Sequence, residues 1–427
     1  LKEVKLEGNT VESTESLMEL ITVKNGELLN SRTLQENVQA IQEKYRADGY
    51  ILAKITDLNI AQDGTLTIKI SEGVLESYKV KGNKKTKDHV ILREMRQKAR
   101  RSMQRVYNLG FFEDVNVKMN PGVEPNAVVM EIDVKEKRTG SFGIGAGYSS
   151  SDGMVGMVSV SDTNFRGMGD TISLSYEMSG DDTDARGYTF MYRRPWLDKK
   201  ETAGTLRVYN RTYEYDDYDE NGNHKESFMR KYSGGEFTLS RPMSEYSTNF
   251  VTLRSRQDKY VKHTETGNAG DRSGNTSWIN KNFGTTRSLT LEHVTDTRDN
   301  VYEPTTGARA SLSAEFAGLG GDFNYQKYIA GDAHYLKAGR SQVFVLRGQY
   351  GISKGSISEY SQFRVGGQDT IRGYREDQFR GTRMALVSAE YRFPIVSKVT
   401  GALFADYGGA WSSGFMPEDL HASVGVG

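Results

Sequence analysis

The chain contains no cysteine and only 7 prolines in 427 residues. Without cysteine it has no disulfides, no thiolate catalysis and no cysteine-ligated metals. It also lacks an apolar run of about 18 residues, so no transmembrane helix is predicted. A membrane is not thereby excluded, because a β-barrel strand needs only about 9–11 alternating residues. Basic and acidic residues balance at 56 each, so no bulk charge favours nucleic acid or an acidic ligand.

Glycine (45) and tyrosine (24) are abundant, a mix that favours many strands joined by tight turns. The length predicts two or three domains. The chain begins at Leu1 rather than Met, which we interpret as a processed or trimmed form.

The first part of the chain contains a repeat. The segment 4–9 (VKLEGN) is echoed at 78–83 (YKVKGN), and residues at helical spacing follow each copy. Both copies finish on alternating strands whose apolar residues share one face, Leu66, Ile68 and Ile70 in the first and Val128, Met130, Ile132 and Val134 in the second. The predicted order is β-α-α-β-β, with one α+β domain at 1–74 and another at 75–138.

The second copy is shorter than the first. Gly8 to Gly49 is 41 positions (49 − 8), whereas Gly82 to Gly110 is 28 (110 − 82). The difference of 13 falls near residues 98–100, where the connection between the two helices should lie. We therefore expect that connection to be missing from the sequence.

From Gly140 onward the period changes from helical to two. About fourteen alternating segments follow, and their polar face repeatedly carries Glu and Arg at mid-strand. A soluble all-β domain would also alternate. The connections, however, vary between short (164–167, 338–340) and long (214–229, 262–283, 354–382). This asymmetry is typical of an outer-membrane β-barrel, which we predict over 139–427.

The sequence ends inside an alternating segment at 422–427. A strand edge left open in lipid would leave backbone groups unsatisfied, and bacterial single-chain barrels have even strand numbers. We therefore expect the C-terminus of the barrel to lie beyond this sequence.

The segment 362–380 (QFRVGGQDTIRGYREDQFR) lies between two alternating strands and carries four arginines and three acids. Connections of this length are uncommon and usually functional. Gly366, Gly367 and Asp369 are its predicted turn residues, and its aromatic residues predict that it folds onto a surface.

Two carboxylates, Glu390 and Asp406, lie on the inward faces of the next two predicted strands. Arg372 is a candidate partner, because a guanidinium binds carboxylates bidentately. The alternative is a solvated loop arginine, with the acids merely lining a polar lumen. The pattern alone leaves both open.

Other motifs do not support a catalytic or metal site. Residues 217–222 match the start of a calcium loop, but Phe228 stands where the bidentate Glu should be, so we interpret them as a solvated acidic loop. Glycines at 143–147 resemble a dinucleotide turn without a following helix. The six histidines show no ligand spacing, and His293 and His334 lack a lipase motif. We predict no enzyme activity, metal or cofactor.

Several of these segments together resemble a known family. Ile371-Arg372-Gly373-Tyr374 is similar to the V/I-R-G-Y/F loop signature of the BamA-type outer-membrane β-barrel assembly superfamily, and the two repeats resemble its periplasmic POTRA domains. Further similar segments are 108–115 (NLGFFEDV), 163–169 (TNFRGMG), 296–300 (DTRDN) and 304–307 (PTTG).

The resemblance implies an antiparallel transmembrane barrel of about sixteen strands when complete, with about fourteen present here. It implies that the sixth extracellular loop enters the lumen, where the signature Arg372 meets acids that map to Glu390 and Asp406. BamA-type members usually carry more than two POTRA units, so we expect N-terminal units to be missing.

The implied function is folding and insertion of β-barrel proteins into the bacterial outer membrane. Its partners would be unfolded outer-membrane proteins, lipid, and periplasmic chaperones and accessory lipoproteins bound by the POTRA domains; nucleic acid is not expected. A sheet edge can template an incoming strand, and the glycine-rich first barrel strand, near 141–149, predicts a weak seam. The alternatives are a TamA-like assembly factor and a two-partner secretion transporter. A passive porin is disfavoured, because it would lack the first 137 residues.

Overall fold

The computed structural model describes residues 1–427 except 49, 51, 96–98, 124–126, 150–152, 180–183 and 397–398. It divides into one unit of residues 1–140 with 162–170 and a second of 141–161 with 171–427. Within the described ranges, every helix is too short or too polar to span a bilayer. The connection expected to be missing between the helices of the second copy was inferred from the position of Gly49 and from a break that begins near Lys98. Both of these positions lie outside the described residues.

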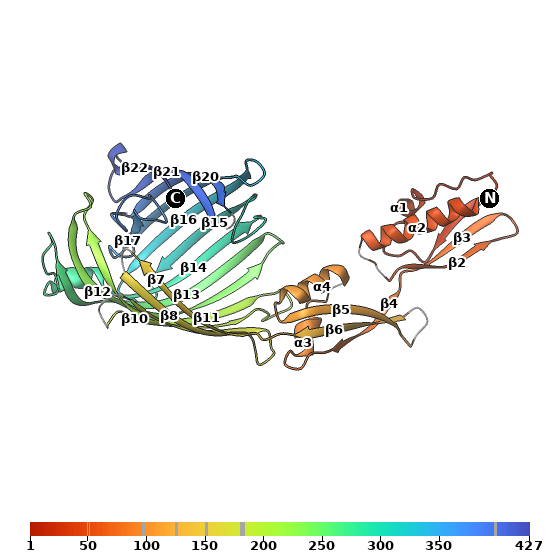
Figure 1. Ribbon diagram of the computed structural model, residues 1–427, viewed down its shortest axis with the longest axis horizontal. Helices are drawn as coiled ribbons and strands as arrows, with labels where there is room; N and C mark the ends of the chain where they lie inside the picture. The colour runs from red at the N-terminus through yellow and green to blue at the C-terminus, as the bar shows by residue number, and fades with distance from the viewer. Residues whose placement is uncertain are drawn as a thin grey trace. The chain divides into compact units, whose positions relative to one another are not determined.

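The first domain is a three-stranded sheet with helices packed on it. Its elements are β1 (Glu3–Glu7), α1 (Thr14–Met18), α2 (Ser31–Ala47), β2 (Lys54–Ile60) and β3 (Thr65–Ser71). The sheet order is β1-β3-β2, with β1 parallel to β3, and α2 lies along one face of it (Figure 1). Leu66 and Ile68 form the core with Ile41 and Tyr45 of α2, so the alternating face predicted for β3 is buried.

The second domain repeats this arrangement. Its elements are β4 (Val74–Lys81), α3 (Asp88–Leu92), α4 (Ala99–Asn108), β5 (Phe112–Pro121) and β6 (Ala127–Glu136), and its sheet order is β4-β6-β5. Ile132 and Met130 of β6 pack against Val90 and Ile91 of α3. The predicted β-α-α-β-β order is confirmed in both copies.

The glycine shared by the two echoed segments has a structural reason. Gly8 and Gly82 both have positive φ, 89° and 83°. A Cβ built on Gly8 would lie 2.1 Å from the carbonyl oxygen of Ile70, and one on Gly82 would lie 2.0 Å from that of Val134. Only glycine tolerates both the dihedral and the close approach of the neighbouring strand.

A glutamate at the end of each sheet completes the turn after this glycine. Glu72 accepts hydrogen bonds from the backbone of Thr10 and Val11, and Glu136 accepts them from that of Lys84, Lys85 and Thr86. Burial alone would raise the pKa of Glu136, but these hydrogen bonds outweigh it and hold the pKa below its ordinary value. Each carboxylate thereby ties the first loop of its domain to the last strand.

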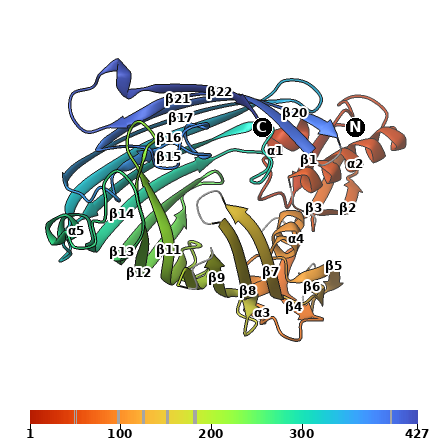
Figure 2. The same ribbon diagram turned by 60° about the vertical axis from the view of Figure 1, so that its left-hand side comes forward.

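The second unit is dominated by one sheet of 14 strands, in the order β22-β21-β20-β17-β16-β15-β14-β13-β12-β11-β10-β9-β8-β7. The strands follow one another around a curved wall (Figure 2) and pair antiparallel wherever their register is described. This confirms the predicted α+β repeats followed by an antiparallel barrel wall. The bounds are β7 (Gly140–Ser149), β8 (Gly153–Phe165), β9 (Asp170–Ser179), β10 (Arg186–Arg194), β11 (Ala203–Tyr218), β12 (His224–Pro242), β13 (Ser247–Thr266), β14 (Gly284–Asp296), β15 (Gly307–Ala317), β16 (Asn324–Lys337), β17 (Val343–Ser356), β20 (Arg383–Val396), β21 (Val399–Trp411) and β22 (His421–Val426).

Two of the expected long connections are shorter than predicted. β11 and β12 remain paired up to Tyr218 and His224, so only 219–223 connect them. β13 continues to Thr266, and the following segment, 267–283, contains the helix α5 (Thr276–Asn282). The prediction was wrong here because a strand ladder is held by backbone hydrogen bonds and continues through polar residues.

Candidate functional site: the lumen loop

The connection between β17 and β20, residues 357–382, is called the lumen loop below. Two short strands within it, β18 (Phe363–Val365) and β19 (Phe379–Gly381), pair with each other. Val365 and Ile371 are fully buried, and they pack with Met384 of β20 and Ala410 of β21. The loop therefore has its own small core, which docks it on the wall.

Glycines shape the tip of the loop. Gly366, Gly367 and Gly373 have φ values of 120°, 98° and 93°, in the region that favours glycine. A Cβ on Gly367 would also lie 1.9 Å from a carboxylate oxygen of Glu376. The backbone of Gly366 donates to the Thr370 hydroxyl at 2.8 Å, while Asp369 is exposed. These turns bring the residue after Ile371 to face the wall.

That residue, Arg372, lies between carboxylates of two neighbouring strands. Its Nε and Nη2 donate to the two oxygens of Asp406 on β21, at 2.8 and 2.7 Å. Its Nη1 donates to Glu390 on β20, at 2.7 Å. The guanidinium also lies 3.5 Å from the ring centroid of Phe404, a favourable cation–π distance.

The two acids differ in how much they depend on this arginine. Asp406 is only 2% exposed, and beyond Arg372 it accepts a hydrogen bond from Ser388 at 2.7 Å. Glu390 has a second cation, because Arg392 Nε donates to it at 2.6 Å. Loss of Arg372 would therefore leave Asp406 as the under-compensated buried charge.

Tyr374, the last residue of the signature, contacts β22. Its hydroxyl donates to the Ala422 carbonyl at 3.3 Å, and its ring lies 5.6 Å from that of His421. Phe379 stacks on the same imidazole at 3.7 Å. The signature thus contacts three consecutive strands, β20, β21 and β22.

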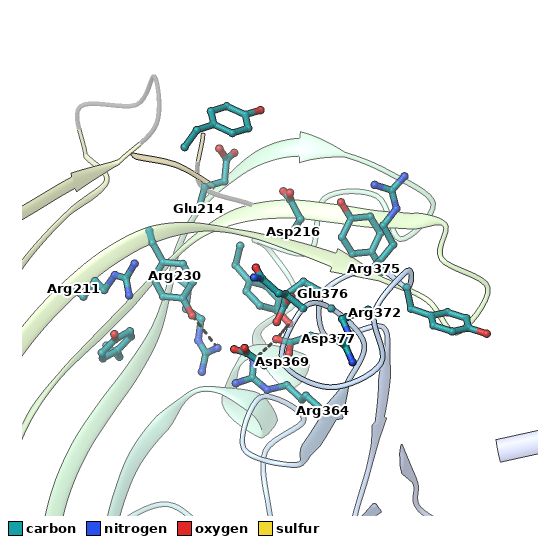
Figure 3. Close-up of a pocket in the computed structure, with 18 of the residues that line it drawn as sticks. Arg211, Glu214, Asp216, Arg230, Arg364, Asp369, Arg372, Arg375, Glu376 and Asp377 are labelled. Atoms are coloured by element: carbon teal, nitrogen blue, oxygen red, sulfur yellow. Dashed lines mark hydrogen bonds and ion pairs between the residues drawn. The ribbon is translucent and has the colours of Figure 1, made fainter. Parts of the chain in front are cut away.

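A cavity of about 920 Å³ lies between the loop tip and β11–β12. Its lining is mixed in charge (Figure 3), with six arginines and five carboxylates: Arg211, Arg230, Arg256, Arg364, Arg372, Arg375, Glu214, Asp216, Asp369, Glu376 and Asp377. Because positive and negative side chains are nearly equal in number, the cavity has little net charge with which to attract an ion of one sign.

Comparison with known proteins identifies the family. The model of the Omp85 superfamily domain matches residues 164–427. The POTRA model, described as a surface antigen variable number repeat, matches 1–73 and 74–137. The chain belongs to the Omp85 superfamily.

Among curated proteins, this Omp85 chain is similar to the outer membrane protein assembly factor BamA of Nitratidesulfovibrio vulgaris, with 25% identity over 92% of the chain and 52% of the relative. It is 24% identical to BamA of Neisseria meningitidis over 99% of the chain and 58% of the relative. The chain therefore spans about half the length of these relatives. It is an outer-membrane protein whose POTRA domains lie in the periplasm.

Solved structures share the Omp85 fold. BamA from Haemophilus ducreyi lacking POTRA domains 1–3 aligns over all of this chain and 92% of that one, with a TM-score of 0.71 and 20% identity. CdiB from Acinetobacter baumannii aligns over all of this chain and 83% of that one, with a TM-score of 0.60 and 15% identity. At these identities the likeness shows the fold alone.

The Omp85 wall also contains charges that sequence reasoning missed. The interpretation of 217–222 as a solvated acidic loop is wrong for Asp217, which is fully buried. It belongs to β11, where Arg272 and Arg380 contact its carboxylate. No local pattern signals this, because both partners lie far away in the sequence.

The two candidate lipase histidines, His293 and His334, hydrogen-bond to an asparagine and an aspartate. His293 contacts Asn249 at 2.6 Å, and His334 contacts Asp332 at 2.7 Å. A group that the sequence did not single out, Glu226, His263 and Asp271, lies close enough to share a metal ion. Arg272 already donates to Glu226 at 2.6 Å, so a guanidinium supplies positive charge there.

Proposed function

We propose that this chain folds and inserts β-barrel proteins into the outer membrane, with domains at 1–74 and 75–138 in the periplasm and a barrel domain over 139–427. The observation that carries the proposal is a pair of POTRA domains in one chain with a strand wall whose lumen loop is held by Arg372. A passive pore has no use for two periplasmic domains, and no nucleotide motif offers another source of energy. The substrate's own folding free energy then drives the work.

In this proposal Arg372 acts as a strut. It bonds to Asp406 and Glu390 on adjacent strands, so it holds the loop against the wall and the two strands against the loop. The turn residues Gly366, Gly367 and Asp369 and the signature residues Ile371, Gly373 and Tyr374 place its guanidinium. None of these residues acts in covalent chemistry.

Strand templating is the proposed mechanism of insertion. β7 is an end strand of the 14-strand sheet, and glycines at 143, 145 and 147 alternate with exposed residues such as Ile144 and Tyr148. One face of β7 thus lacks side chains to pack across a seam, so its pairing with a closing strand is weak. An opened seam would expose backbone groups to which a substrate strand could add.

The POTRA domains are proposed to receive unfolded outer-membrane proteins, periplasmic chaperones and accessory lipoproteins. β2 is an edge strand of the first domain, and it exposes Leu58 and Ile60, at 42% and 54%. An extended chain adding to this edge would gain backbone hydrogen bonds and apolar contact.

The test is depletion in cells, with quantitative proteomics of the outer membrane. The proposal expects many barrel proteins to fall together, and re-expression of the intact protein to restore them. Loss of a single secreted protein, with barrel proteins at normal levels, would instead identify a two-partner secretion transporter. Loss of a small subset of barrel proteins would favour a TamA-like factor.

A further inference from the structure

A second buried charge cluster contacts the lumen loop at Arg380, away in sequence from Arg372 and on a different strand of the wall. Its centre is Asp217 of β11, which has no solvent exposure. Arg380 Nη2 donates to one carboxylate oxygen at 2.5 Å, and Arg272 Nη2 donates to the other at 2.7 Å. Lys225 lies 3.6 Å away, and the Tyr360 hydroxyl donates at 3.3 Å.

The two arginines come from different connections. Arg380 belongs to β19 at the C-terminal end of the lumen loop, whereas Arg272 belongs to the segment 267–283 that precedes β14. Arg272 also donates to the fully buried Glu226 at 2.6 Å, and its guanidinium lies 3.9 Å from the ring centroid of Trp278 in α5. The 267–283 segment is therefore held by two carboxylates, Glu226 and Asp217. It shares Asp217 with the lumen loop.

Other contacts of the lumen loop surround the same point. Tyr360 packs among aromatic residues of β11, β12 and the 267–283 segment, with its ring 5.5 Å from Tyr215 and 5.0 Å from Phe283. Gln378 Nε2 donates to the Glu220 carbonyl at 3.0 Å, and the Tyr215 hydroxyl donates to Asp377 at 3.2 Å. Both ends of the loop thus lie against β11 and its neighbours.

We propose that Asp217 is a second anchor of the lumen loop and the charge on which that loop and the 267–283 segment depend jointly. A buried carboxylate is tolerated only with its cations in place, so movement of either connection leaves Asp217 under-compensated. Arg372 holds the tip to β20 and β21, and Asp217 holds the base to β11. Seven pairings separate β11 from β20 in the sheet order, so the loop bridges two distant parts of the wall.

Because the two anchors are independent, we expect each half of the loop to leave the wall without the other half. Loss of Asp217 frees the base, near Tyr360 and Arg380, while Arg372 retains the tip. Loss of Arg372 does the reverse. Asp217 is a positioning residue in this scheme, acting through Arg380 and Arg272.

Cysteine labelling tests this directly, because the chain has no cysteine of its own. Ser358→Cys places a thiol at a buried position at the base, and Thr370→Cys places one at the tip. Each is combined with Asp217→Asn or with Arg372→Ala, and the purified protein is labelled with a maleimide. Heat-modifiability on gels verifies that the barrel remains folded.

We expect Asp217→Asn to accelerate labelling at Ser358→Cys by about tenfold or more and at Thr370→Cys by less than about twofold, since local opening follows local stability. Arg372→Ala should do the reverse, accelerating labelling at Thr370→Cys strongly and at Ser358→Cys only slightly. Asp219→Asn is the matched control, because this nearby aspartate bonds to Asn223 and Asn268 rather than to the loop. It should change neither rate.

Equal acceleration at both thiols by both variants would show a loop that moves as one body, and it would overturn the proposal. Unchanged labelling in Asp217→Asn would overturn it as well. If Asp217→Asn fails to give a folded barrel, Arg380→Gln removes one cation and must raise the Ser358→Cys rate selectively. Labelling reports the position of the loop itself, so the result is independent of the proposed assembly function.

Discussion

Arg372→Ala is the substitution for which the structure predicts the largest loss at the loop tip. It removes both side-chain hydrogen bonds to Asp406, the bond to Glu390 and the contact with Phe404, while the backbone N–H of residue 372 still donates to Asp406. Removing one partner of a fully buried ion pair costs about 3–5 kcal/mol. The Arg372 side chain is 20% exposed and Glu390 retains Arg392, so we expect about 2–4 kcal/mol from the docked state.

That free energy corresponds to a docking equilibrium shifted roughly 30- to 700-fold, at about 1.4 kcal/mol per factor of ten. Arg372→Lys should fall between wild type and alanine, because an ammonium retains the charge but not the bidentate geometry. The measurement is the labelling rate of a thiol at Thr370→Cys, together with the yield of folded barrel protein in a reconstituted assembly reaction.

The matched control is Arg375→Ala. Arg375 lies on the same loop, is exposed, and stacks over Tyr218 at 5.3 Å. It should leave both labelling and assembly near wild type. If Arg375→Ala and Arg372→Ala impair assembly equally, the impairment comes from the loss of positive charge on the loop and not from the loss of the Arg372 bonds to Asp406 and Glu390. If Arg372→Ala leaves thiol labelling unchanged, the energetic reasoning is wrong.

Three further outcomes are expected. Gly147→Val in β7, where an added Cβ meets open space, should strengthen strand pairing, so that the thermal stability of the barrel rises while assembly slows; faster assembly would contradict a weak seam. Gly82→Ala should destabilise its POTRA domain by about 2–4 kcal/mol in denaturant unfolding, because the new Cβ overlaps a strand carbonyl, whereas Gly110→Ala, with similar φ and open space, should cost only about 1 kcal/mol. Glu136→Gln should lower stability at neutral pH by about 1–2 kcal/mol. The pKa of Glu136 is depressed in the folded domain, so its contribution is present above the unfolded pKa and fades as pH falls through the folded one; a mutant deficit in thermal melts that does not shrink as the pH is lowered below the unfolded pKa would refute this.

Local patterns in the sequence determine the architecture. Period-two alternation in Ala385–Phe393 placed Ser388 and Glu390 on one face of a strand, because side chains in a strand point alternately to its two sides. Alternation likewise predicted that Leu66, Ile68 and Ile70 of β3 share one face, and all three lie in the first core. The echoed Gly-Asn pairs are visible in the sequence too, although the carbonyl that makes Gly82 obligatory lies on a distant strand.

Only the tertiary structure decided which charges meet. Alternation put Glu390 and Asp406 inward, but whether an arginine reached them depended on the path of a loop whose turns at Gly366, Gly367 and Gly373 have no period to read. Asp217 shows the limit most clearly: its sequence suggested a solvated acid, yet Arg272 and Arg380, 55 and 163 residues away, bury and neutralise it. Long-range ion pairs depend on how a curved wall brings segments that are remote in sequence together in space, and no local propensity encodes such a contact.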